Sequence, residues 1–269
     1  MNERQHLPDA NRLSILASTI LLAYAISPYV NIPARSFGIT LFGAVYSINF
    51  DFGLLLSLLV SMLAAVGAEW LIRDHPELRE TNTMQHWILP ALTAWVLGVP
   101  LRNLQPGLEW WVVFAFGGVL LILVFVAEYI VVDLADDLHA PAAIGLTAVS
   151  FALYLFLAIS LRAAGLRLYT MLPTIVLTMA LVALRTLYLR LNGRWCLVWG
   201  ASIAVIVGQF AVGFHYWPLS PLSFGLLLVG PSYALTSTAV LIEENRPWQT
   251  LWIEPVVMLA IFWGMAVMV

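Results

Sequence analysis

The chain has 269 residues, of which 62% are hydrophobic and 10% are charged, and its formal net charge is −3. Soluble domains are about 45–50% apolar and about 25% charged, so a soluble fold of this length could not bury this much apolar surface, and a membrane is the expected solvent. All 12 basic residues are Arg, and the acidic balance gives no electrostatic basis for binding nucleic acid. A single cysteine, Cys196, excludes an intrachain disulfide bond.

The polar residues 1–12 precede a first apolar run, residues 13–32. A cleaved signal peptide is an alternative for this run, because the Ala-Tyr-Ala sequence inside it resembles a cleavage site. The acidic residues Glu3 and Asp9 ahead of the run favour a retained membrane span.

Residues 36–52 have a different pattern, since apolar side chains occupy alternate positions on either side of Phe42, Gly43 and Ala44. This period of two, with β-branched and aromatic residues, predicts a short β-hairpin. The segment is also too short to cross a membrane as a helix. We expect it to form a cap on the extracellular or periplasmic surface, and an irregular amphipathic loop is the alternative.

Nine apolar runs follow one another along the chain, each near the ~20 residues that a membrane-spanning helix needs. They are residues 13–32, 52–72, 86–101, 109–132, 142–161, 168–191, 195–214, 222–241 and 251–269. The sequence therefore predicts an all-α fold, a polytopic transmembrane helical bundle of about nine spans that forms one integral membrane domain over residues 1–269. Eight or ten spans are also compatible with the pattern.

Arginine is distributed unevenly between the two sides of these spans. If the N-terminus is inside, the inner arginines are Arg4, Arg12, Arg73, Arg79, Arg190, Arg194 and Arg246, and the outer ones are Arg35, Arg102, Arg162 and Arg167. Because basic residues favour the cytoplasmic side, we expect a cytoplasmic N-terminus in the inner (plasma) membrane.

Two prolines interrupt the last two predicted spans. Pro231 follows Gly230 in the eighth span, and Pro255 follows Glu254 early in the ninth. Proline removes a helix hydrogen bond, so we expect each helix to kink or restart there. Broken helices are one signature of transporters, but these two breaks do not occupy matching positions in two halves of the chain.

Four charged side chains fall inside predicted spans, where charge is costly and is a functional candidate. They are Glu69, Glu128, Arg185 and Glu254. On the predicted orientation all four lie near the cytoplasmic surface. One hypothesis is a water-accessible inner vestibule with Glu128 and Arg185 as its central ion pair. The alternative is that these groups reach the lipid headgroups or pair to fix helix packing.

Asp133, Asp136 and Asp137 follow the fourth predicted span with the spacing i, i+3, i+4. If the helix continued, the three carboxylates would share one face and could hold Mg²⁺, with substrate phosphates completing its coordination shell. Prenyl-transferring membrane enzymes use Asp-rich motifs of this general kind, but they need two facing motifs and this chain has one. A solvated acidic loop is the alternative.

The remaining motifs predict no cofactor. The five histidines lack the HExxH and CxxCH spacings, and only His86 falls within a predicted span, so neither haem nor a histidine-bound metal is expected. The chain also lacks the GxSxG sequence of a nucleophilic serine and the glycine-rich loops that bind phosphates.

Five stretches of the chain carry a further signal. They are AAVGAEWLIRDHP, HWILPAL, VAEYIVVD, LRTLYLRLNGRW and YWPLSPLSFGLLLVG. Together they resemble an uncharacterised family of bacterial polytopic inner-membrane proteins, a domain of unknown function, over about residues 52–241. The resemblance implies a multi-helix integral protein of the bacterial inner membrane, and it implies no catalytic residue, since no activity is attached to it.

Three functions remain open from the sequence, and whether the protein is an enzyme is open with them. The first is a non-enzymatic membrane component or scaffold, whose partners are the lipid bilayer and either another membrane protein or a second copy of the chain. The second is a small-molecule or lipid transporter that uses the cytoplasmic-side polar cluster. The third is a metal-dependent lipid-modifying enzyme that uses Asp133, Asp136 and Asp137.

Overall fold

The structure is a computed structural model, and it describes residues 7–30, 35–41, 44–50, 52–73, 75, 78, 83–191, 193–247 and 252–269; over 35–50 it describes the backbone. The chain divides into two compact units, Met1–His139 and Ala140–Val269. Each unit has its own set of packed helices, and that the two together make one domain stays a prediction.

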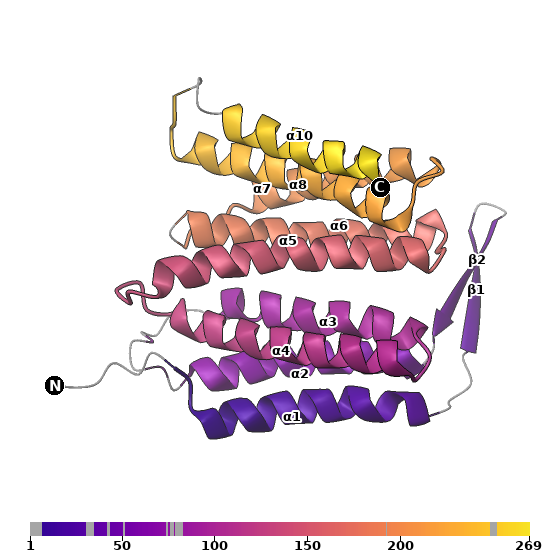
Figure 1. The fold of residues 1–269 in the computed structure, drawn as a ribbon, viewed down its shortest axis with the longest axis horizontal. Helices are drawn as coiled ribbons and strands as arrows, with labels where there is room; N and C mark the ends of the chain where they lie inside the picture. The colour runs from indigo at the N-terminus through magenta and orange to yellow at the C-terminus, as the bar shows by residue number, and fades with distance from the viewer. Residues whose placement is uncertain are drawn as a thin grey trace. The chain divides into compact units, whose positions relative to one another are not determined.

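Unit 1 is a bundle of α-helices that run side by side (Figure 1). Its described helices are α1 (Ala10–Ile26), η1 (Ser27–Tyr29), α2 (Phe52–Ile72), η2 (Met84–His86), α3 (Ile88–Asn103) and α4 (Leu108–Ile130). Every pair among α1, α2, α3 and α4 is in contact. All four contribute to one apolar core, with Ile20, Ala64, Leu97 and Leu121 as buried examples from each in turn.

Two strands lie between α1 and α2 in the sequence. β1 (Arg35–Leu41) and β2 (Ala44–Phe50) pair antiparallel, with Arg35 opposite Phe50 and Leu41 opposite Ala44. They occupy the alternating segment of the sequence. The residues between them, Phe42 and Gly43, lie outside the described part of the chain. The expected place of this segment on the outer membrane surface stays a prediction.

Unit 2 is organised around α8. Its helices are α5 (His139–Ala163), which begins at the last residue of unit 1, α6 (Leu168–Arg190), α7 (Leu197–His215), α8 (Pro221–Glu243) and α10 (Ile253–Met268). α8 packs against α6, α7 and α10. In the most apolar 18-residue stretch of α8, 72% of the residues are buried, whereas the same fraction is 22–44% in the other long helices. This makes α8 the central helix of the unit.

α8 continues through Pro231, where the sequence predicts a kink or a restart. Because proline has no N–H, the carbonyl of Leu227, four residues earlier, receives no helix hydrogen bond from it. The indole Nε1 of Trp263 on α10 donates to that carbonyl at 3.2 Å instead. Gly230 leaves room for the Trp263 ring, since a Cβ there would lie 3.0 Å from it. The proline therefore supplies an acceptor that holds α10 on α8.

Pro255 does not break α10 either, because it is the third residue of the helix. The N–H groups of the first turn have no partner within the helix, so proline is tolerated there.

The C-terminal end of α7 is held by a side chain of α5. Arg162 of α5 donates to the carbonyl oxygens of His215 (2.9 Å) and Trp217 (2.8 Å). A cation at a helix C-terminus is favourable because the carbonyl oxygens there carry partial negative charge.

Glycine sets the spacing of several helices in unit 1. A Cβ on Gly98 of α3 would collide with the Ser57 side chain of α2, and one on Gly117 of α4 would collide with Leu97 of α3. In membrane bundles, small residues at contacts let the helix backbones approach closely. These positions explain how α3 fits between α2 and α4.

Seven of the described helices are long and apolar enough to cross a membrane. α3 and α10 have 16 residues each, which at ~1.5 Å per residue gives about 24 Å, less than the ~30 Å of a hydrocarbon core. Each of the nine predicted apolar runs contains one α-helix. The helical part of the predicted fold is confirmed, while the number of crossings stays a prediction.

Candidate functional site

A buried ion pair lies where η2 meets the last turn of α4 in unit 1. The Nδ1 atom of His86 is 2.7 Å from Oε2 of Glu128. His86 is 6% exposed and Glu128 is 1% exposed. A carboxylate can only accept hydrogen bonds, so an ionised Glu128 requires the proton on His86 Nδ1.

Two aromatic rings extend this pair into a cluster, which we call the His86–Glu128 cluster and define as His75, His86, Glu128 and Tyr129. The His75 and Tyr129 rings have centroids 4.6 Å apart and are tilted by 57°. All four residues are buried. Tyr129 follows Glu128 in α4, so the tilted ring pair and the His86–Glu128 pair both involve the last turn of this helix. Burial strengthens each electrostatic interaction in the cluster and raises the cost of removing one partner.

The sequence predicts Glu128 as a buried charge but misses His86 as its partner. The signal that could have identified His86 is the position of each residue along its predicted span. The third predicted span begins at His86 and the fourth ends just after Glu128, so antiparallel neighbours bring the two residues to the same level of the membrane. Apolar periodicity alone could not show that they face each other, because the rotation of each helix is set by packing.

Arg185 lies on α6 of unit 2 and is fully buried. Its guanidinium carbon lies 5.8 Å from the centroid of the Tyr188 ring, one turn later on the same helix. Such a cation–π contact is favourable when it is shielded from water. Glu128 and Arg185 belong to different units, and the ion pair between them stays a prediction.

The other two predicted charges have partners in their own units. Glu69 accepts from Arg73 Nε at 2.9 Å and also from its Nη2, in an i, i+4 pair at the end of α2. Glu254 Oε1 accepts from the Tyr233 hydroxyl at 2.7 Å and from Ser237 Oγ at 3.2 Å. These carboxylates therefore join neighbouring turns or neighbouring helices.

The three aspartates after α4 do not share a helical face. α4 ends at Ile130 and α5 begins at His139. Asp133 accepts from the backbone N–H of Ala135, and Asp136 accepts from that of Leu138, both at 2.8 Å. Asp137 is exposed. Asp side chains commonly bond the backbone two residues on, and this competes with helix formation. Among the described residues, no group of three or more His, Cys, Asp or Glu side chains could hold a metal ion.

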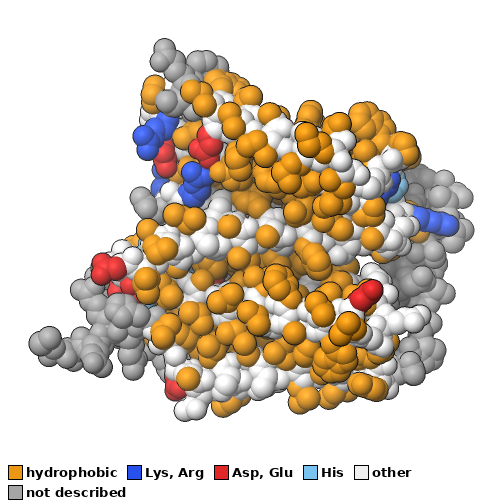
Figure 2. Space-filling model, viewed as in Figure 1, with side chains coloured by type: hydrophobic (Ala, Val, Ile, Leu, Met, Phe, Trp, Pro, Cys, Tyr) orange, Lys and Arg blue, Asp and Glu red, His pale blue; other side chains and the backbone are white. Residues whose placement is uncertain are grey.

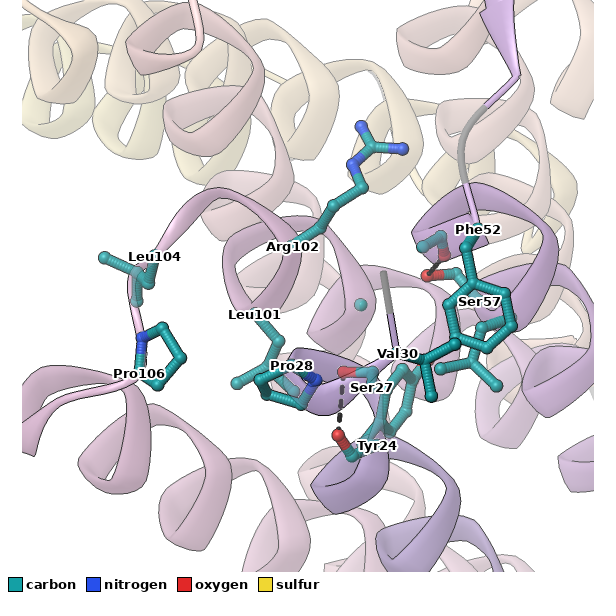
Figure 3. Close-up of a pocket in the computed structure, with 13 residues that line it drawn as sticks. Tyr24, Ser27, Pro28, Val30, Phe52, Ser57, Leu101, Arg102, Leu104 and Pro106 are labelled. Atoms are coloured by element: carbon teal, nitrogen blue, oxygen red, sulfur yellow. Dashed lines mark hydrogen bonds between the residues drawn. The ribbon is translucent and has the colours of Figure 1, made fainter. Parts of the chain in front are cut away.

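A small pocket opens at the other end of unit 1, beside the ends of α1, α2 and α3 (Figure 3). Its volume is about 240 Å³. The hydroxyls in its wall are already engaged: Tyr24 donates to the Ala94 carbonyl at 2.6 Å, and Ser27 and Ser57 donate to carbonyls of their own helices. Figure 3 shows the Arg102 guanidinium directed away from Tyr24 and Ser27. The pocket therefore presents few free polar groups to a ligand.

Unit 2 has a larger and more apolar hollow, which we call the α5–α10 groove. It is lined from α5, α6, α8 and α10 and has a volume of about 580 Å³. Phe151 of α5 packs against Tyr233 of α8, with ring centroids 5.4 Å apart, at its wall. No sequence motif marks it, because residues that face lipid and residues that line an apolar groove are of the same types.

The fold defines a class of protein built from several helices that are long and apolar enough to span a membrane. The comparisons with known proteins then give the family. Residues 32–269 match a family described as protein of unknown function (DUF5656), and the chain belongs to this family. The match confirms the resemblance to an uncharacterised family and extends beyond residues 52–241. No curated protein and no solved structure matches the chain.

Proposed function

We propose that the protein is a non-enzymatic component of the bacterial inner membrane, a scaffold for another membrane protein or for a second copy of itself. One observation supports this proposal above others: two carboxylates of unit 1 are bonded to side chains of the same unit. Glu128 pairs with His86, and Glu69 pairs with Arg73. Polar groups that bind one another fix helix packing, whereas groups that carry cargo or react must be open to it.

Variants of the His86–Glu128 pair can distinguish a scaffold from a transporter or an enzyme. Replacing a buried ion pair with apolar residues of similar volume is often neutral or stabilising. If the pair is architectural, the double variant His86→Leu/Glu128→Leu retains the fold and the function in cells. If the pair moves a proton or binds a substrate, the double variant folds and loses that function.

The test is complementation of a deletion strain, measured by competitive growth against the wild type. Thermal unfolding in detergent is measured on the same variants, so that folding and function are read separately. The matched control is Thr93→Val, which alters a buried polar side chain of α3 that is bonded to its own helix. A double variant as stable as the wild type that fails to complement, beside a control that complements, contradicts the scaffold role.

The proposed topology has nine crossings, a cytoplasmic N-terminus and the β1–β2 segment outside. The excess of arginine on one side supports it. The count depends on the two short helices, α3 and α10, and α3 is tested first. Alkaline phosphatase, which is active only outside the cytoplasm, is fused after Gln105, just beyond α3. Activity there supports a crossing by α3, and an inactive but expressed fusion contradicts it. A fusion after Asp137 is the control and is expected to be inactive.

A further inference from the structure

The shape of the α5–α10 groove follows from the sizes of the side chains along it. α5 contributes the small residues Ala143, Thr147, Ala148 and Ala152. From residue 143 to residue 155 the helix advances about 18 Å at ~1.5 Å per residue. Ile144, Phe151 and Leu155 of α5 also line the groove, and the short side chains between them leave space that larger ones would fill. The groove is therefore elongated along α5.

Apart from Arg190 and Tyr233, the rest of the lining is apolar. α8 contributes Val229, and α10 contributes Met258 and Phe262. Ile144, on the rim, is 71% exposed. Figure 2 shows the visible face of unit 2 covered largely by hydrophobic side chains, with acidic and basic side chains together at one end and further basic side chains at the other. A long apolar channel that is open along its side matches an acyl chain rather than a compact polar molecule.

The charged end has both signs. Arg190, the last residue of α6, lines the groove, is half-buried, and forms neither a hydrogen bond nor an ion pair with the residues that the structure describes. Tyr233 lines the same groove and donates its hydroxyl hydrogen to Glu254. Ser237 donates to the same oxygen, Oε1. A cation and a carboxylate thus flank Tyr233 at one end of the groove.

We propose that the α5–α10 groove binds one glycerophospholipid with a zwitterionic headgroup. An acyl chain lies along α5 and α10, the phosphate binds Arg190, and the headgroup ammonium binds Glu254. The volume of about 580 Å³ is within the ~300–1,000 Å³ of small-molecule sites. This inference requires only that unit 2 lies in a membrane, and it does not depend on the scaffold role.

The charges select the headgroup. A guanidinium makes strong, charge-assisted hydrogen bonds to a phosphate, so a lipid without a phosphate leaves Arg190 without its partner. A purely anionic headgroup satisfies Arg190 but brings negative charge to Glu254. Ethanolamine has an ammonium with N–H donors that a carboxylate can accept, whereas the choline ammonium has none. Phosphatidylethanolamine is therefore the lipid that fits best.

The experiment is native mass spectrometry of the full chain, purified in detergent, delipidated, and titrated with phosphatidylethanolamine, phosphatidylcholine or phosphatidylglycerol. We expect one phosphatidylethanolamine to bind at least ten times more tightly than either of the other two. Ala148→Phe fills the channel and lowers this affinity at least tenfold, while Ala201→Phe, at an exposed alanine of α7, is the matched control and leaves it unchanged.

The headgroup is tested with Arg190→Gln, which we expect to weaken the binding of phosphatidylethanolamine and of phosphatidylcholine alike about tenfold, because both lipids carry the phosphate. Arg194→Gln is its control, because Arg194 is exposed and pairs with Glu243 outside the groove. Equal binding by the wild type, Ala148→Phe and Arg190→Gln indicates nonspecific lipid and overturns the proposal. Binding of free phosphoethanolamine that Ala148→Phe does not affect also overturns it, because the acyl chain then contributes nothing.

Discussion

One buried or half-buried charged side chain from each unit shows a difference between the two units. In unit 1 the buried Glu128 has His86 at 2.7 Å, and the hydroxyls around the small pocket donate to backbone carbonyls. In unit 2 a half-buried arginine, Arg190, lines an apolar groove without a hydrogen bond to any residue that the structure describes. A polar group with an internal partner stabilises one packing, whereas a charge beside an open apolar channel is available to a ligand. Our two proposals therefore give unit 1 an architectural role and unit 2 a lipid-binding role.

The largest expected effect tests the unit 1 side of this comparison. His86→Ala leaves the buried Glu128 carboxylate without its imidazole, and breaking a buried pair from one side costs about 3–5 kcal/mol. Arg190→Ala in unit 2 removes no hydrogen bond, so we expect a loss within about 0.5 kcal/mol. Chemical unfolding in detergent measures the free energy of unfolding of both variants. Equal losses would contradict the difference between the two units.

The next effect concerns glycine packing. Gly98 of α3 faces the Ser57 side chain of α2 and the Tyr24 hydroxyl, so Gly98→Ala overpacks the contact and costs about 1–3 kcal/mol. Gly264 of α10 has open space where a Cβ would lie. Gly264→Ala should therefore be neutral or stabilise by up to about 1 kcal/mol, since alanine favours helix. Thermal unfolding of both variants compares a close contact in unit 1 with a loose position in unit 2.

A smaller effect tests how α10 is held. Trp263→Phe removes the indole N–H that bonds the Leu227 carbonyl, which costs about 1 kcal/mol. Pro231→Ala supplies a backbone N–H to the same carbonyl, so the Trp263 change should cost less in that background. A double-mutant cycle of unfolding free energies measures the coupling. Additive losses would show that the freed carbonyl does not hold α10.

The smallest effect is expected at the end of α2. Arg73, whose side chain is 69% exposed, pairs with Glu69 one turn away. Exposed ion pairs contribute little because water and salt screen them. Arg73→Gln should change the unfolding free energy by less than about 0.5 kcal/mol. A loss comparable with that of His86→Ala would mean that Glu69 belongs with the buried charges of unit 1.

Much of the fold could be predicted from the sequence, because apolar runs of about 20 residues specify helices strongly. Each predicted run contains a helix. The site was harder to predict than the fold, as Glu128 and the three aspartates show. Depth in the membrane identified Glu128 as buried, but its partner depends on helix rotation, which a sequence does not state. The aspartate prediction needed α4 to continue, and α4 ends at Ile130 while Asp133 and Asp136 bond nearby backbone N–H groups.

The α5–α10 groove could not be predicted at all. Its alanines on α5 are ordinary residues of an apolar helix, and their small size has a consequence only when α8 and α10 stand opposite them. Arg190 was placed at the inner side by counting arginines. Counting cannot distinguish an arginine that reaches the headgroups from one that lines a hollow.

The shortness of α10 has a consequence for the surrounding lipid. Most of its side chains are not buried, with Pro255 and Ala266 as the buried exceptions, so a membrane-crossing α10 meets lipid along about 24 Å, where the hydrocarbon is ~30 Å thick. Lipids next to a short helix compress to match it, at a cost of a fraction of a kcal/mol per Å. α10 is also one wall of the groove. If α10 crosses a membrane, the lipids beside the groove are therefore among those that its length deforms.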